Sequence, residues 1–131
     1  MAITHEELKT QVSDQEGLVE RLRTEKKFLI NKIHQEGFEL GIRSSSKLSY
    51  KEFQHFERVS PLAASLDEDV LDYLWTFLDT HGYSQEARTY DPDFDHLLDV
   101  SPQSRIVFAQ GWLEGVISVW QTIKSQVEKD A

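Results

Sequence analysis

Glu52 and His55 have the Glu-x-x-His spacing with which helical bundles bind a pair of metal ions. Such a centre also needs a second copy of the motif and carboxylates from other helices. Asp93 and His96 come nearest to a second copy, and they lie in a predicted turn. Ordinary polar side chains are therefore the better interpretation, and we expect no metal site here.

Asp91, Asp93 and Asp95 imitate the start of a calcium-binding loop, in which alternate carboxylates supply ligands. His96 stands where that loop has its glycine, and Pro102 stands where it has its bidentate glutamate. Both features are required for the loop to turn and to close around the ion. We therefore interpret this stretch as an acidic turn exposed to water.

Phosphate-binding and nucleophilic motifs are equally incomplete. In "GIRSSSK", residues 41–47, two basic side chains flank three serines, but the Gly-Lys-Ser/Thr ending of a phosphate-binding loop is missing. The chain has no cysteine, which excludes disulfides and thiol nucleophiles and is typical of a reducing compartment such as the cytoplasm. We expect no catalytic residue, no cofactor and no enzymatic activity.

Two short segments resemble each other: "EGFELGI", residues 36–42, and "QGWLEGV", residues 110–116. Each has two glycines four residues apart, Gly37 with Gly41 and Gly111 with Gly115. Both segments fall inside predicted helices, where a spacing of four places both glycines on one face. A glycine inside a helix costs about 0.5–1 kcal/mol relative to alanine, so we expect these four to allow close helix packing.

The first forty residues must form the longest element, because their apolar residues follow a heptad repeat. Positions a and d of this repeat predict a dimer seam made of Leu8, Val12, Gln15, Val19, Leu22, Lys26 and Leu29. A lone helix with one narrow apolar seam is unstable, so we expect a homodimer. The alternative is that the helix folds back on its own domain. We expect residues 1–27 to project and residues 28–131 to form a compact helical domain.

The remaining elements are predicted from capping and turn signals. Ser49 and Glu52 form a capping box that predicts a helix over residues 50–59. An apolar stripe predicts a second helix that ends at Gly82, a typical C-terminal cap. The turn "DPDFD" then favours a short β-hairpin near residues 85–100, and the alternative is a loop with a short helix starting at Pro92. The fold class is thus mainly α with one small hairpin.

The last helix begins after Ser101 and Pro102, which are typical of an N-cap and a first turn. Residues 106–120 are apolar on most sides, so this helix is expected at the centre of the core. Trp112 and Trp120 lie on it and are the candidate lining of an apolar ligand pocket.

Charge is distributed unevenly over the chain, whose formal net charge is −9. Residues 67–99 contain ten acids and Arg88 as the only Lys or Arg. This acidity disfavours nucleic acid and favours a basic partner protein or simple solubility. No apolar run has the ~20 residues of a membrane span, so no membrane contact is expected. The candidate partner surface consists of Tyr83, Tyr90, Asp91, Asp93, Phe94 and Asp95.

From Gly37 onward, the order of features resembles the 4-vinyl-reductase-type ligand-binding domain, a relative of the trafficking-complex fold. The segments that carry the resemblance are "GFELG", "LSYKEF", "LDEDVLDYLWTFLDTHGY", "ARTYDPDFDHLLDVS" and "FAQGWLEGVISVW". The family's cysteines are missing and its later strands have no room. The resemblance implies a small-molecule-binding or regulatory module, with the four glycines as packing positions.

These observations together favour a non-catalytic dimeric adaptor or regulatory protein that acts through protein–protein interaction. One alternative is a sensor domain that binds a small apolar ligand. Another is an acidic decoy or chaperone for a basic partner.

Overall fold

The protein is mainly helical, which confirms the predicted fold class at that level. The computed structural model describes the backbone of residues 5–130 and the side chains of residues 15–127. Its elements are α1 (His5–Ser44), a 3-10 turn η1 (Ser45–Lys47), α2 (Tyr50–Ala64), α3 (Glu68–Thr80), α4 (Tyr83–Tyr90), α5 (Phe94–Leu98) and α6 (Ser104–Asp130).

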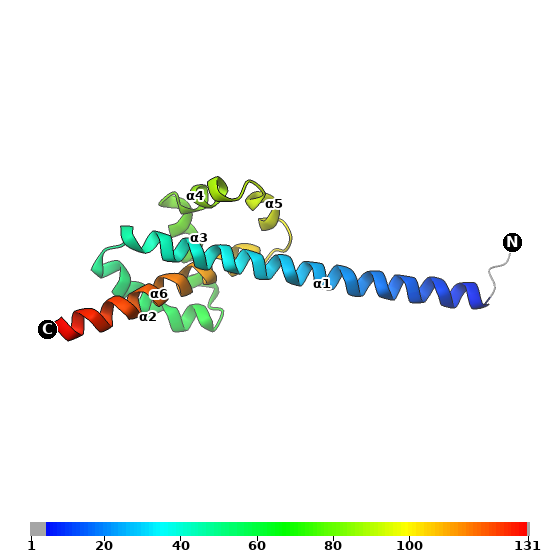
Figure 1. Ribbon diagram of the computed structural model, residues 1–131, viewed down its shortest axis with the longest axis horizontal. Helices are drawn as coiled ribbons and strands as arrows, with labels where there is room; N and C mark the ends of the chain where they lie inside the picture. Colours follow the sequence, from blue (N-terminus) through cyan, green and yellow to red (C-terminus); the bar gives the residue numbers. More distant parts are fainter. Residues whose placement is uncertain (1–4, 131) are drawn as a thin grey trace.

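Helices α1 and α6 run side by side in the same direction and form the axis of the body (Figure 1). Gly37 of α1 faces Phe108 and Trp112 of α6, and Gly41 faces Trp112 and Gly115. Helices α2 and α3 pack on α6, while α4 and α5 pack on α1. The remaining helices therefore surround one central pair.

Aromatic rings fill the core around Trp112, which is 0% exposed. The ring centroids of Phe56, Phe77 and Tyr83 lie 5.1, 5.7 and 5.8 Å from that of Trp112. Buried aromatic pairs in tilted arrangements add about 0.5–1.5 kcal/mol each to the hydrophobic contribution. Helices α2, α3, α4 and α6 are thus joined through one aromatic cluster.

Helix α2 starts as predicted and ends later than predicted. The hydroxyl of Ser49 accepts from the Glu52 amide, and the Glu52 carboxylate accepts from the Ser49 amide, which completes the capping box. The helix continues through Pro61 to Ala64 instead of ending at residue 59. Proline removes one backbone hydrogen bond. The Gln110 amide of α6 donates to the Ala63 carbonyl at 3.0 Å and holds the last turn in place.

The hairpin predicted near residues 85–100 is wrong, because that stretch contains helices α4 and α5. Gly82 has a φ of 76°, a conformation that suits glycine and separates α3 from α4. Tyr83 and Ala87, four apart, are buried from α4, and α5 buries Phe94. The spacing of four between Tyr83 and Ala87 matches the period of a helix. Their burial in the core therefore outweighs the turn signal of the sequence. The alternative of a short helix near Pro92 is close to the observed start of α5.

Helix α1 extends well beyond the body (Figure 1). Residues 15–28 are exposed, Leu29 and Ile30 are half-buried, and Ile33 is fully buried. This change lies next to the predicted boundary between residues 27 and 28. No helix of the described chain has the length and apolar character needed to cross a membrane.

Candidate functional site

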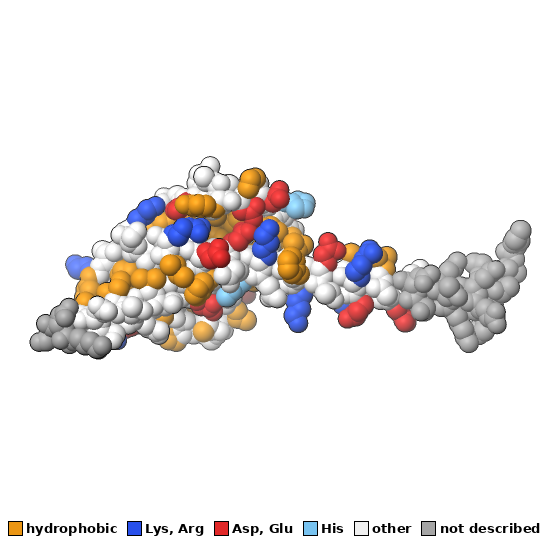
Figure 2. Space-filling model, viewed as in Figure 1, with side chains coloured by type: hydrophobic (Ala, Val, Ile, Leu, Met, Phe, Trp, Pro, Cys, Tyr) orange, Lys and Arg blue, Asp and Glu red, His pale blue; other side chains and the backbone are white. Residues whose placement is uncertain are grey.

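The projecting part of α1 carries apolar side chains that the described chain leaves exposed. Val19 and Leu22 are 45% and 51% exposed, and Leu18 beside the seam is 45% exposed. Gln15 and Lys26, the polar seam positions, are exposed as well. Hydrophobic and charged side chains lie next to each other along this segment (Figure 2). The predicted seam residues Leu8 and Val12 lie outside the described side chains.

The exposed seam continues directly into the buried face of α1. Gly37 lies eighteen residues beyond Val19, which is about five turns at 3.6 residues per turn, so both lie on one line along the helix. Gly37 faces α6, and Ile33 and Leu40 beside it are 0% exposed. Helix α6 thus covers in the body the same face that stays exposed over residues 15–28.

The four glycines lie where α1 and α6 meet. A Cβ atom on Gly41 would be 3.1 Å from the Cα of Gly115 and would overlap the Trp112 carbonyl oxygen. A Cβ atom on Gly115 would overlap the Phe38 carbonyl oxygen, and Gly37 and Gly111 have equally close backbone neighbours. The absence of side chains at these positions allows the two backbones to touch.

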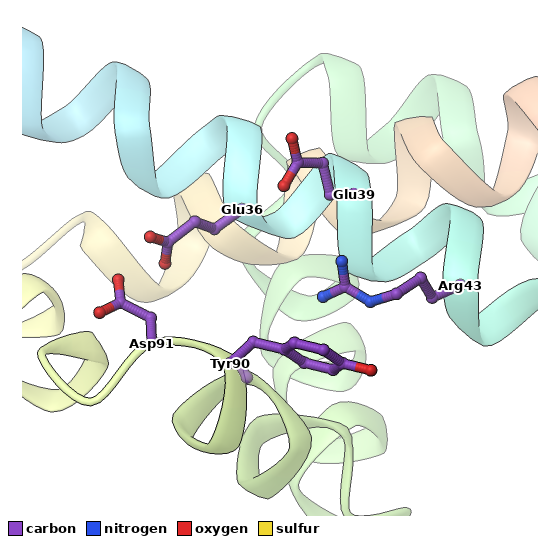
Figure 3. Close-up of a pocket in the computed structure, with 6 residues that line it drawn as sticks. Glu36, Glu39, Arg43, Tyr90 and Asp91 are labelled. Carbon is purple, nitrogen blue, oxygen red and sulfur yellow. The ribbon is translucent and has the colours of Figure 1, made fainter.

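A polar cavity of about 260 Å³ lies between α1 and the end of α4 (Figure 3). Its lining residues are Glu36, Glu39, Arg43, Ala87, Tyr90 and Asp91. The guanidinium carbon of Arg43 is 4.1 Å from the centre of the Tyr90 ring, which is a cation–π contact. This contact and the carboxyl pair on the other side of the cavity connect α4 to α1.

The carboxyl groups of Glu36 and Asp91 point toward each other (Figure 3). Burial, the hydrogen bond with Asp91 and the negative charge of Asp91 together raise the pKa of Glu36 to about 8, and burial is the largest of these causes. The same hydrogen bond lowers the pKa of Asp91. The Lys32 ammonium lies 3.9 Å from Asp91 and 4.0 Å from Glu36. At neutral pH the pair therefore holds one proton, carried by Glu36 and donated to an Asp91 carboxylate.

The aromatic members of the predicted partner surface do not form one exposed surface. Tyr83 and Phe94 are 5% and 0% exposed, so their assignment to a surface is wrong. Burial of these two large rings in the core is favourable, and it outweighs the tendency of the acidic residues next to them in sequence to stay exposed. Tyr90 is 64% exposed, and one face of its ring is covered by Arg43.

The acidic members of that surface have different surroundings. Asp91 is half-buried against Glu36, while Asp93 and Asp95 are exposed. The Arg88 guanidinium donates to Asp95 at 2.8 Å, which neutralises part of the negative charge. The predicted surface is thus reduced to a few exposed groups around the α4–α5 turn.

Trp112 and Trp120, the candidate ligand pocket, lie in the core, and Trp120 is 3% exposed. The ring of Trp120 stacks on Phe53 at 5.2 Å, and its indole N–H donates to Glu57. The indole N–H of Trp112 is buried and has no hydrogen-bond partner in the described part of the chain. An apolar ligand beside these rings stays a prediction.

Glu52 and His55 were considered above as a metal-binding motif. In the structure the Glu52 carboxylate caps the start of α2 instead. Within the described residues, no group of three or more His, Asp or Glu side chains is arranged to hold a metal ion.

The sequence interpretation missed the pairing of Glu36 with Asp91. One signal was present: Glu36 lies seven positions after Leu29, so the heptad repeat continues onto it, and a carboxylate is unusual at such a position. Its partner is 55 positions away in the chain and on another element, so no local pattern connects the two.

Compared with models of protein families, with curated proteins and with solved structures, the chain shows no significant match. The resemblance to the 4-vinyl-reductase-type domain therefore stays a prediction.

Proposed function

We propose that this protein is a non-catalytic dimeric adaptor or regulatory protein, whose two copies pair through the seam of α1. The observation that carries the proposal is the exposure of Val19 and Leu22 on a helix that extends beyond its own body. Apolar side chains at heptad spacing on a projecting helix are typical of coiled-coil pairing.

The energy available from the described residues suits a reversible dimer. Leu18, Val19 and Leu22 are each about half exposed, and full burial of such a side chain contributes roughly 1.5–3 kcal/mol. Counted over two copies, the remaining burial amounts to roughly 5–9 kcal/mol, which is of the same order as the cost of association. We therefore expect association to depend on protein concentration.

The adaptor role draws on a second exposed apolar region, at the α2–α3 turn. Leu62 and Leu66 are 47% and 62% exposed there, and Leu66 lines a cavity of about 210 Å³. Leu66 has a φ of 63°, and a residue with a side chain adopts this conformation at a cost of about 1–2 kcal/mol. An exposed apolar side chain held at such a cost is a reasonable contact point for a partner protein.

Sedimentation velocity tests the dimer. We expect the chain to pass from monomer to dimer between about 1 and about 200 µM, since the association is weak. Val19→Asp should keep it monomeric, because it buries a charge in the seam. Thr24→Asp adds the same charge on an exposed position away from the seam and should leave association unchanged. A wild-type chain that stays monomeric over this range would contradict the proposal.

A further inference from the structure

The body of each copy limits how two seams can meet. The line through Val19 runs onto Gly37, where α6 already covers the face. Two copies in parallel would bring both bodies to the same end, where each copy's α6 occupies the space that the other α1 requires. An antiparallel pair places the bodies at opposite ends of the paired helices.

We infer that the two copies pair antiparallel, with the twofold axis passing between residues 20 and 21 of each α1. In this register Val19 faces the partner's Leu22, and Gln15 faces the partner's Lys26. The inference rests on the proposed dimer and deepens it by assigning a direction and a register.

The two polar seam positions support this register. Gln15 and Lys26 are equally distant from the proposed axis, so they fall in the same layer of the antiparallel pair. The glutamine carbonyl oxygen then accepts from the lysine ammonium, and Val19 and Leu22 face each other across the seam. In a parallel pair, Lys26 would face the partner's Lys26 across the seam, with two like charges in contact.

Charges beside the seam support the same direction. Gln15 and Leu22 are d positions of the heptad repeat. Glu16 and Arg23 directly follow them and are exposed, so both are e positions on the same flank of the seam. In an antiparallel pair the e flanks of the two helices face each other, and this register places Glu16 opposite the partner's Arg23 twice by symmetry. In a parallel pair, Arg23 would instead face Leu18 and would gain no ion pair.

The register also limits the length of the paired segment. Residue 10 of the partner is level with residue 31, and α6 begins near that level because Gly37 faces Phe108. The partner's helix therefore reaches the body near its residue 10, and its residues 5–9 lie level with residues 32–36, beside the start of α6. The described residues 15–26 lie at the centre of the paired segment.

Disulfide trapping tests the direction, because the chain has no cysteine of its own. Gln15→Cys and Lys26→Cys are prepared separately as full-length chains, each alone or mixed under reducing conditions, and then oxidised with a glutathione buffer. Residues 15 and 26 lie about 16 Å apart along a helix, far beyond the reach of a disulfide. We expect at least a tenfold excess of cross-linked dimer in the mixture over either variant alone.

The outcomes separate this inference from the proposed dimer. Cross-linking of each variant with itself, without an excess in the mixture, would show a parallel pair and overturn the inference. A dimer by sedimentation that cross-links in none of the samples would also overturn the register while the proposed function stands. A monomer by sedimentation at all concentrations would contradict both.

Discussion

The proton between Glu36 and Asp91 links α1 to the turn between α4 and α5. Glu36 keeps this proton up to a pKa of about 8, since Glu36 is half-buried and faces a carboxylate. Lys32 offsets part of the remaining negative charge, and Glu39 and Arg43 line the same cavity. A single proton thus determines whether this contact is a hydrogen bond or a repulsion between two carboxylates.

Glu36→Gln should remove the resulting pH dependence of stability. Between pH 4.5 and about 8 the unfolded carboxyl is ionised while the folded one is protonated, so folding takes up a proton. The free energy of unfolding should fall as pH rises through this window, by at most about 1.4 kcal/mol per pH unit. The glutamine amide still donates to Asp91 without titrating, so the variant should lose this slope. Urea denaturation at several pH values between these limits measures it.

Glu39→Gln is the matched control, since it makes the same change on the wall of the same cavity. It should keep most of the wild-type slope, because the negative charge of Glu39 is the smallest of the causes that shift the pKa of Glu36. Equal slopes for the Glu36→Gln variant and the wild type would show that Glu36 ionises normally in the folded protein.

Gly115→Ala should destabilise the fold, because its Cβ would overlap the Phe38 carbonyl oxygen. Overpacking of this kind costs about 1–3 kcal/mol or more. Gly17→Ala is the control: a Cβ there meets nothing within 4 Å, and alanine should gain about 0.5–1 kcal/mol in an exposed helix. Thermal unfolding by circular dichroism measures both. A Gly115→Ala variant as stable as the wild type would contradict the close packing of the two backbones.

At the scale of elements, α1 is one continuous helix with two parts in different surroundings. Over residues 33–44 it behaves as a core helix, packed through glycines on α6. Over residues 15–28 its seam holds Val19 and Leu22 between the polar Gln15 and Lys26, and no described element packs against it. The same face serves both parts, so in the proposed dimer a second copy would continue outward the packing that α6 provides within the body.

Reversing the charges beside the seam should weaken and then restore the dimer. Glu16→Arg places two arginines opposite each other in the antiparallel register, and Arg23→Glu places two glutamates there. Exposed ion pairs contribute about 0.2–1 kcal/mol each and occur twice, so each single variant should raise the dimer Kd several-fold. The double variant should return close to the wild-type Kd. Sedimentation at low salt measures this, and a double variant as weak as the singles would exclude the pairing of Glu16 with Arg23.

The whole molecule is a small body on a long rod (Figure 1). In the proposed antiparallel dimer, α1 would hold the two bodies apart, and each body would meet its own partner protein through the α2–α3 turn. In a parallel dimer the bodies would be neighbours. The arrangement proposed here therefore suits a spacer or a bridge between two copies of one target.

Small-angle X-ray scattering should show this separation. With residue 37 near the middle of each body, the two bodies lie about 50 Å apart at 1.5 Å per residue. We expect a second maximum near that distance in the pair-distance distribution, which Val19→Asp should abolish. A dimer whose distribution has a single maximum would be incompatible with bodies at opposite ends.

Patterns within one element were enough to determine several features from the sequence. The helical class, the capping box at Ser49 and the length of α1 each depend on neighbours in the chain. Backbone propensity and hydrophobic period act over a few residues, so these features were predictable. The glycine pairs were recognisable from the sequence as well. Each glycine inside a helix costs stability, so two such pairs indicate that close packing compensates for this cost.

Only the tertiary structure decided what lies against what. In the sequence, Tyr83 and Phe94 look like members of an exposed acidic turn, yet both are buried. They lie on α4 and α5, two helices in the stretch where a hairpin was predicted. Glu36 and Asp91 acquire a shared proton because distant segments meet and exclude water. Burial and electrostatic coupling arise between elements, and the energy that decides them is released only when the chain packs. The sequence alone determines which faces need a neighbour, and the fold determines which neighbour each face receives.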